Sequence, residues 1–155
     1  MISEIQTITT LPYTFRSFPH IRKIQVDFNN LFIFGKLKED FVKFKRIIQN
    51  SEPSLIIGIA LSKTRSSYFE PTTINQFNQT KRVENHPNKS YKLNFPINSN
   101  NFKLSKTPTD SFCNWTMYKI ADFIHSRKYN ILQYFVHIKE KDIKYLKEMI
   151  LKPSA

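Results

Sequence analysis

Runs of apolar residues separated by polar stretches predict four strands along the chain. Leu55–Leu61 and Ile131–Val136 are almost continuously apolar, which is typical of strands covered on both faces. Two further runs, Ile5–Leu11 and Leu31–Phe34, are rich in β-branched or aromatic residues, as strands usually are. We expect the two continuous runs to lie at the centre of a sheet.

Three other segments are predicted to be helices. In Leu37–Gln49 the apolar residues recur on one face at the spacing of an amphipathic helix. We expect a second helix over Phe112–Ser126 and a third over Lys141–Leu151, which stops before Pro153. Helices that alternate with strands predict an α/β fold, here a three-layer α/β/α arrangement with a mostly parallel sheet. We expect residues 1–155 to form a single domain.

Composition supports a packed core and excludes one class of site. Hydrophobic residues make up 40% of the chain and aromatic residues 14%, which is enough to form a core. The polar stretch from Pro71 to Thr109 is expected to be mostly loop or extended edge. The only glycines are Gly35 and Gly58, so a glycine-rich loop that binds phosphate is excluded.

The net charge of +12 raises the alternative of a nucleic-acid-binding module, because basic proteins attract phosphate backbones. The lysines are scattered, however, and no dense basic run or known nucleic-acid-binding motif accompanies the charge. Charge alone therefore does not predict a nucleic-acid partner.

The single cysteine and the hydropathy of the chain indicate a cytoplasmic protein. One cysteine cannot form an internal disulfide. The first ten residues lack the basic and apolar segments of a signal peptide, and no apolar run approaches the roughly 20 residues needed to span a bilayer. We therefore expect no membrane partner.

Cys113 lies at the start of the second predicted helix, just after Thr109 and Asp110, either of which could cap it. Free backbone N–H groups and the helix dipole would stabilise a thiolate there, and the same groups could stabilise an oxyanion. Cys113 also shares an apolar stripe with Met117 and Ile120, so an inert, buried cysteine is the alternative interpretation.

His137 and Glu70 are the candidate partners of this thiol. His137 directly follows the predicted strand Ile131–Val136, and Glu70 lies in the loop after Leu55–Leu61. Since the carboxyl ends of parallel strands and the N-termini of the following helices meet at one edge of a sheet, we expect the thiol, the imidazole and the carboxylate to converge there. That combination is typical of a cysteine peptidase.

The other histidines fit this chemistry less well. His20 and His86 lie beside prolines in polar loops, and His125 is about three helical turns from Cys113, roughly 18 Å away. The histidines and the cysteine show no spacing typical of metal ligands, so we expect no metal.

Three segments of the chain resemble the pyroglutamyl-peptidase I family. SLIIGIALSKTRSSYFEPTTIN is similar to the family's strand and the following loop that carries a catalytic glutamate, here Glu70. Residues 105–114, SKTPTDSFCN, resemble the segment around the nucleophile, here Cys113, and YFVHI resembles the strand end with the catalytic histidine, here His137. The order Glu, Cys, His is also that of the family.

The resemblance implies a mechanism and a substrate. Cys113 would attack the carbonyl of an N-terminal pyroglutamyl residue, His137 would move the proton and Glu70 would orient the imidazole. The family acts on peptides in the cytosol and needs no metal or other cofactor. The expected activity is thus that of a cysteine-type omega-peptidase.

The chain also departs from the family pattern. We expect it to lack the family's first strand with its aromatic loop, and the spacing of Phe15 and Phe18 does not place them at the site. A family helix is expected to be missing between Pro96 and Phe102, and Pro108-Thr109 replaces the family's Ala-Gly. These departures leave open the alternative that the chain is a catalytically inactive relative, which acts as a binding or interaction protein. A lost edge strand would expose a sheet edge, which is compatible with a dimer.

Overall fold

A computed structural model describes residues 9–78, 80–96, 102–109 and 111–151. Its centre is a six-stranded sheet with the order β2-β1-β3-β8-β4-β7. The strands are β1 (Thr10–Phe15), β2 (Phe32–Phe34), β3 (Leu55–Leu61), β4 (Tyr68–Phe69), β7 (Lys103–Leu104) and β8 (Leu132–Ile138). All neighbouring pairs are parallel except β4 and β8, which run antiparallel. The predicted α/β class with a mostly parallel sheet is confirmed.

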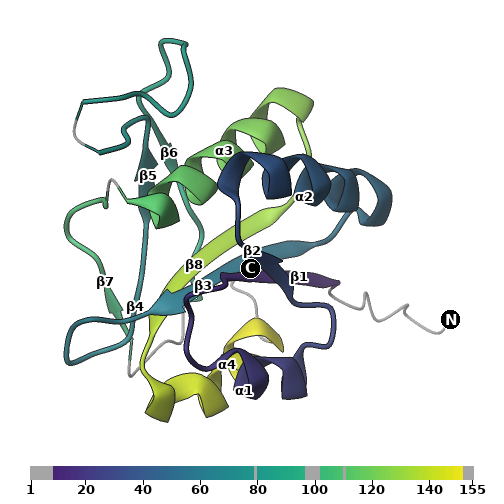
Figure 1. Cartoon of the computed structure of the whole chain (residues 1–155), viewed down its shortest axis with the longest axis vertical. Helices are drawn as coiled ribbons and strands as arrows, with labels where there is room; N and C mark the ends of the chain where they lie inside the picture. Colours follow the sequence, from purple (N-terminus) through teal and green to yellow (C-terminus); the bar gives the residue numbers. More distant parts are fainter. Residues whose placement is uncertain (1–8, 79, 97–101, 110, 152–155) are drawn as a thin grey trace, which may run out of the picture.

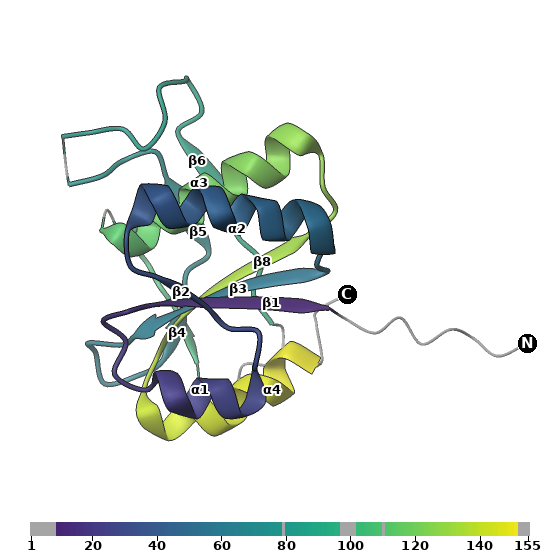
Figure 2. The same ribbon diagram turned by 45° about the vertical axis from the view of Figure 1, so that its right-hand side comes forward.

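Helices cover both faces of the sheet (Figures 1 and 2). One face carries α2 (Leu37–Ser51) and α3 (Phe112–Arg127), and the other carries α1 (Ile21–Asp27) and α4 (Ile143–Leu151), which follows a 3₁₀ turn over Glu140–Asp142. Each face has its own apolar core, because alternate side chains of a strand point to opposite sides. The predicted three layers are therefore present.

The two central strands were predicted closely. β3 has the predicted bounds, and β8 begins one residue later and ends two residues later than predicted, so that His137 lies inside the strand. These strands pair in parallel over seven residues, with Ala60 opposite His137. The histidine side chain is therefore held by the sheet rather than by a loop.

The N-terminal strand was predicted incorrectly. The prediction was Ile5–Leu11, whereas β1 spans Thr10–Phe15 and lies between β2 and β3; residues 1–8 are outside the described part of the chain. β1 thus runs from the N-terminal region into the main sheet, and the expected absence of the family's first strand stays a prediction. The helix expected to be missing between Pro96 and Phe102 falls on residues 97–101, which are also outside the described residues.

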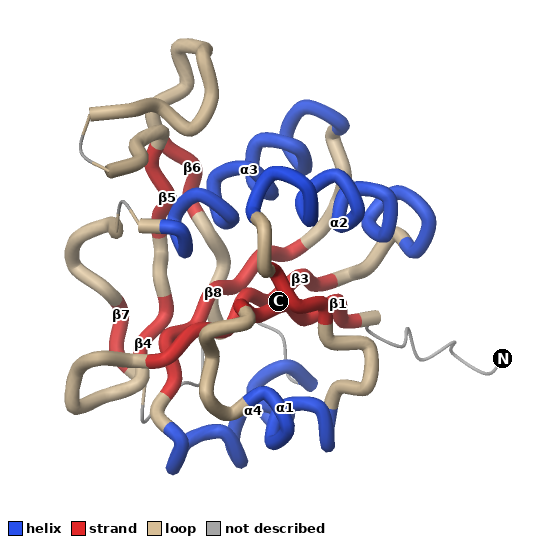
Figure 3. The backbone as a smooth tube through the Cα atoms, in the orientation of Figure 1, coloured by secondary structure: helices blue, strands red, loops and turns tan. Residues whose placement is uncertain are grey.

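A small hairpin stands apart from the main sheet (Figure 3). Its strands β5 (Thr72–Ile74) and β6 (Ser90–Lys92) pair antiparallel. The side chain of Asn114, in the first turn of α3, fixes the hairpin: its Oδ1 accepts hydrogen bonds from the Thr73 hydroxyl (2.6 Å) and the Ile74 N–H (3.1 Å), and its Nδ2 donates to the carbonyls of Ile74 and Gln76. The hairpin is thereby tied to the helix that carries Cys113.

Candidate active site

His137 lies on the face of β8 that α2 and α3 cover. Phe135, two residues earlier, belongs to the core on that face, and the period of two in a strand puts His137 on the same side. Only 8% of the residue is exposed. Its ring stacks on Tyr68 of the neighbouring strand, with centroids 4.5 Å apart and an interplanar angle of 17°. Packing and strand pairing thus hold the imidazole in place.

Glu70 reaches His137 because of the short antiparallel strand β4. Tyr68 pairs with His137 in the sheet, and the Glu70 N–H donates to the Phe135 carbonyl at 3.0 Å. Tyr68 and Glu70 are two residues apart and so lie on one face. Oε1 of Glu70 lies 3.1 Å from Nε2 of His137, and the Glu70 side chain is 2% exposed. The sequence analysis placed Glu70 in a loop and missed β4.

The contact between these two groups is close but poorly aligned. At 3.1 Å the two atoms are within ion-pair distance. Among the described residues, however, neither Nε2 of His137 nor Oε2 of Glu70 has a hydrogen-bond partner of acceptable geometry. Buried polar atoms without partners are costly and concentrate at sites that bind or react.

Cys113 is the second residue of α3 and is a free, buried thiol. The residue at the N-cap position is Ser111, where Thr109 or Asp110 had been expected; Asp110 is outside the described residues. Burial raises the pKa of the thiol to about 12, and the nearby charge of Glu70 adds to the increase, while a hydrogen bond with Ser111 and the charge of Lys63 oppose it. Desolvation thus outweighs the groups at the helix start that were expected to favour a thiolate.

Cys113 and His137 line the same cavity, of about 470 Å³. Its walls are mainly apolar and include Phe15, Phe18 and Phe112, with the rings of Phe15 and Phe112 4.7 Å apart, edge to face. Phe15 ends β1 and Phe18 follows three residues later. The structure thus brings the thiol and the imidazole to one cavity and places the carboxylate against the imidazole. It also places Phe15 and Phe18 in the cavity wall, which their spacing in the sequence did not predict.

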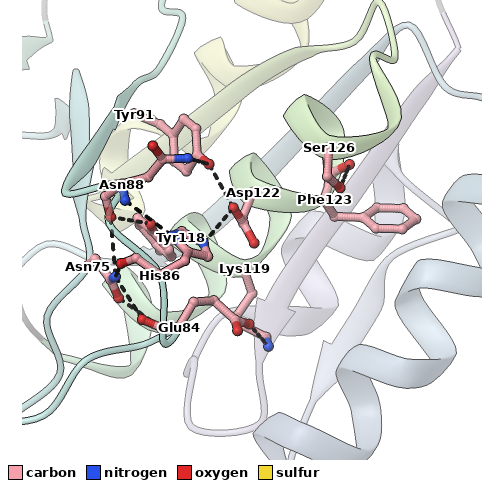
Figure 4. A network of polar contacts seen from close by, with 10 residues as sticks. All are labelled: Asn75, Glu84, His86, Asn88, Tyr91, Tyr118, Lys119, Asp122, Phe123 and Ser126. Atoms are coloured by element: carbon pink, nitrogen blue, oxygen red, sulfur yellow. Dashed lines mark hydrogen bonds and ion pairs between the residues drawn. The ribbon is translucent and has the colours of Figure 1, made fainter.

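The other histidines are engaged elsewhere. His86 belongs to a polar network on the outer side of α3 (Figure 4), where its Nε2 lies 2.9 Å from Asp122 Oδ1 and Tyr91 donates to the same oxygen at 2.6 Å. His20 lies 3.8 Å from Glu140, and His125 stacks on Tyr91. None of the three lines the cavity with Cys113.

The described residues contain neither a metal-ligand cluster nor a membrane-spanning helix. No group of three or more histidine, cysteine, aspartate or glutamate side chains there could hold a metal ion. Likewise, no helix within the described ranges is both long and apolar enough to cross a membrane.

Comparison with solved structures identifies the fold. The chain matches pyroglutamyl peptidase I from Bacillus amyloliquefaciens with a TM-score of 0.70 and 16% identity, over 96% of this chain and 88% of that one. It matches the pyrrolidone carboxyl peptidase from Thermococcus litoralis with a TM-score of 0.68 and 17% identity, over 85% of this chain and 76% of that one. A mutant of the Pyrococcus furiosus enzyme gives a TM-score of 0.61 at 18% identity, over 94% and 89% of the two chains. No family model and no curated protein matches the sequence. The chain thus has the fold of the pyroglutamyl peptidases.

Proposed function

We propose that this chain is a divergent pyroglutamyl peptidase, a cytoplasmic cysteine peptidase that removes an N-terminal pyroglutamyl residue from peptides. The observation that carries the proposal is the shared cavity of Cys113 and His137, with Glu70 against the imidazole, inside a fold common to peptidases of this specificity. The largely apolar cavity suits a small, uncharged lactam ring.

The proposed reaction begins with a neutral thiol. Nε2 of His137 faces Glu70, which leaves Nδ1 as the ring nitrogen to accept the proton of Cys113. As that proton moves, Sγ bonds to the pyroglutamyl carbonyl carbon, and backbone N–H groups at the start of α3 stabilise the oxyanion. The C–N bond then breaks, and the amine leaves with the proton from His137. Water hydrolyses the thioester, releasing pyroglutamate and restoring the thiol.

The raised pKa of Cys113 makes His137 essential in this scheme. A thiol with a pKa of about 12 is almost entirely protonated at neutral pH, so the base must act during the attack rather than before it. Glu70 would stabilise the imidazolium that forms and align its ring, as the third member of a triad does.

The test is release of a fluorescent amine from a pyroglutamyl substrate. We expect turnover by the wild-type protein, and losses of several orders of magnitude in Cys113→Ala and His137→Ala. Glu70→Gln, which keeps the shape but removes the charge, should retain partial activity. Turnover that survives in Cys113→Ala would exclude the proposed nucleophile.

A non-catalytic relative that binds peptides is the second candidate function. It is favoured by the raised thiol pKa and by the misaligned contact between Glu70 and His137. A folded protein that binds a pyroglutamyl peptide without any Cys113-dependent hydrolysis would select this alternative.

A further inference from the structure

A second cavity, of about 620 Å³, adjoins the cavity that contains Cys113. The two share Tyr68 and Thr109 as walls and are therefore immediate neighbours. The shared Tyr68 is the ring that stacks on His137. The second cavity is thus lined by Tyr68 and Glu70, which both contact the imidazole, and by none of the phenylalanines of the first cavity.

The second cavity has cationic walls. Arg65 and Lys103 both line it and are exposed, and Lys63 lines the first cavity. Within the described residues, none of the three forms an ion pair with an acidic side chain. Glu70 is the acidic residue among the walls, but it is buried with Oε1 turned toward His137. Among the described residues, the open part of this cavity thus presents positive charge that forms no ion pair with an acidic side chain.

Hydrogen bonds fix the backbone at Lys103 and around Arg65. Lys103 belongs to β7, which pairs in parallel with β4, and its N–H donates to the Ser67 carbonyl at 3.0 Å. Arg65 lies in a tight turn, where the hydroxyls of Ser62 and Thr64 donate to the Ser66 carbonyl at 2.6 and 2.8 Å. The backbone of Lys103 is therefore paired with β4, and Arg65 lies in the turn that leads into this strand, which positions Tyr68 and Glu70.

We propose that this second cavity binds the part of the peptide that follows the scissile bond, and that Arg65 and Lys103 select peptides with an acidic residue directly after the pyroglutamyl group. This inference rests on the proposed function for the position of the first residue. A carboxylate there meets two cations that have no acidic partner among the described residues, whereas a lysine meets like charge, so the two peptides are discriminated by both attraction and repulsion.

The experiment compares three amidated peptides, pyroglutamyl-Glu-Ala, pyroglutamyl-Gln-Ala and pyroglutamyl-Lys-Ala, as substrates at low ionic strength. We expect kcat/KM to be about tenfold higher for the Glu peptide than for the Lys peptide, as two exposed charge contacts would give. The ratio of kcat/KM for the Glu peptide to that for the Lys peptide should approach one in the Arg65→Ala/Lys103→Ala variant. In the wild-type protein this ratio should decrease in 0.5 M salt. The matched control, Arg46→Ala/Lys147→Ala, removes one arginine and one lysine from α2 and α4 and should keep the preference.

A binding measurement separates this inference from the proposed function. The affinities of Cys113→Ala for fluorescein-labelled versions of the Glu and Lys peptides are compared, with and without the Arg65/Lys103 substitutions. Hydrolysis without charge preference, or with a preference that the double variant retains, overturns the inference and leaves the peptidase intact. Tighter binding of the Glu peptide without hydrolysis supports the inference while the peptidase proposal fails. If the peptides are neither bound nor hydrolysed, both the inference and the peptidase proposal are overturned.

Discussion

The buried thiol of Cys113 leads to a prediction about its reactivity with iodoacetamide. Its pKa is raised from 9.0 to about 12, mainly by burial, and the residue is only 5% exposed. Each pKa unit changes the thiolate fraction tenfold, so the reactive form at pH 7 is about a thousandfold rarer than in an unperturbed thiol.

A more basic thiolate is a stronger nucleophile, which recovers part of this loss. With a Brønsted coefficient of about 0.45, three pKa units give about a twentyfold increase in intrinsic rate. The net expectation is that folded protein is alkylated about 50-fold more slowly than an unperturbed thiol, before any further slowing by restricted access.

The same chain provides the reference, because Cys113 is its single cysteine. Alkylation is followed by mass spectrometry from pH 6 to 9.5, for native protein and for protein unfolded in urea. The native rate should be lower throughout and should increase about tenfold per pH unit without a plateau. Native protein that reacts as fast as unfolded protein, or a plateau below pH 8, would refute this reasoning and would indicate a preformed thiolate.

Three further predictions concern stability, measured by urea unfolding. Gly58→Ala should destabilise the fold by about 2 kcal/mol or more, since the new Cβ would lie 2.4 Å from ring atoms of both Tyr13 and Phe135 in a full core; wild-type stability would contradict this packing. Asn114→Ala should cost about 3 kcal/mol, because it leaves buried partners in the β5–β6 hairpin unsatisfied, and should speed proteolysis there; unchanged proteolysis would show that the hairpin is held otherwise. Asp40→Ala should cost about 1 kcal/mol at pH 7, because Oδ2 of Asp40 accepts hydrogen bonds from two backbone N–H groups at the start of α2. These hydrogen bonds lower the pKa of Asp40, so its stabilising effect is complete above the ordinary carboxyl pKa and is lost as the pH falls through the lowered value; a difference that persists below pH 2 would contradict the assignment.

The local pattern of apolar and polar residues was sufficient to predict those helices and strands that have a strong periodicity or a continuous apolar run. The bounds of β3 and the first residues of α2 and α3 agree with the prediction, because burial on both faces or on one stripe imposes a composition that can be read locally. α1 was missed, and only Ile24 of its seven residues is buried, which leaves too little apolar pattern to detect.

The arrangement of the candidate site depended on the tertiary structure. The sequence identified Glu70, Cys113 and His137 as candidates, but β4 is only two residues long and shows no periodicity. Its antiparallel pairing with β8 stacks Tyr68 on His137 and brings Glu70 to the imidazole. The pKa of Cys113 likewise depends on how completely distant segments exclude water from the start of α3, and burial there outweighs the effect expected of a helix N-terminus. Residue types and local periods are properties of the sequence, whereas strand partners and desolvation arise from contacts between segments far apart in the chain.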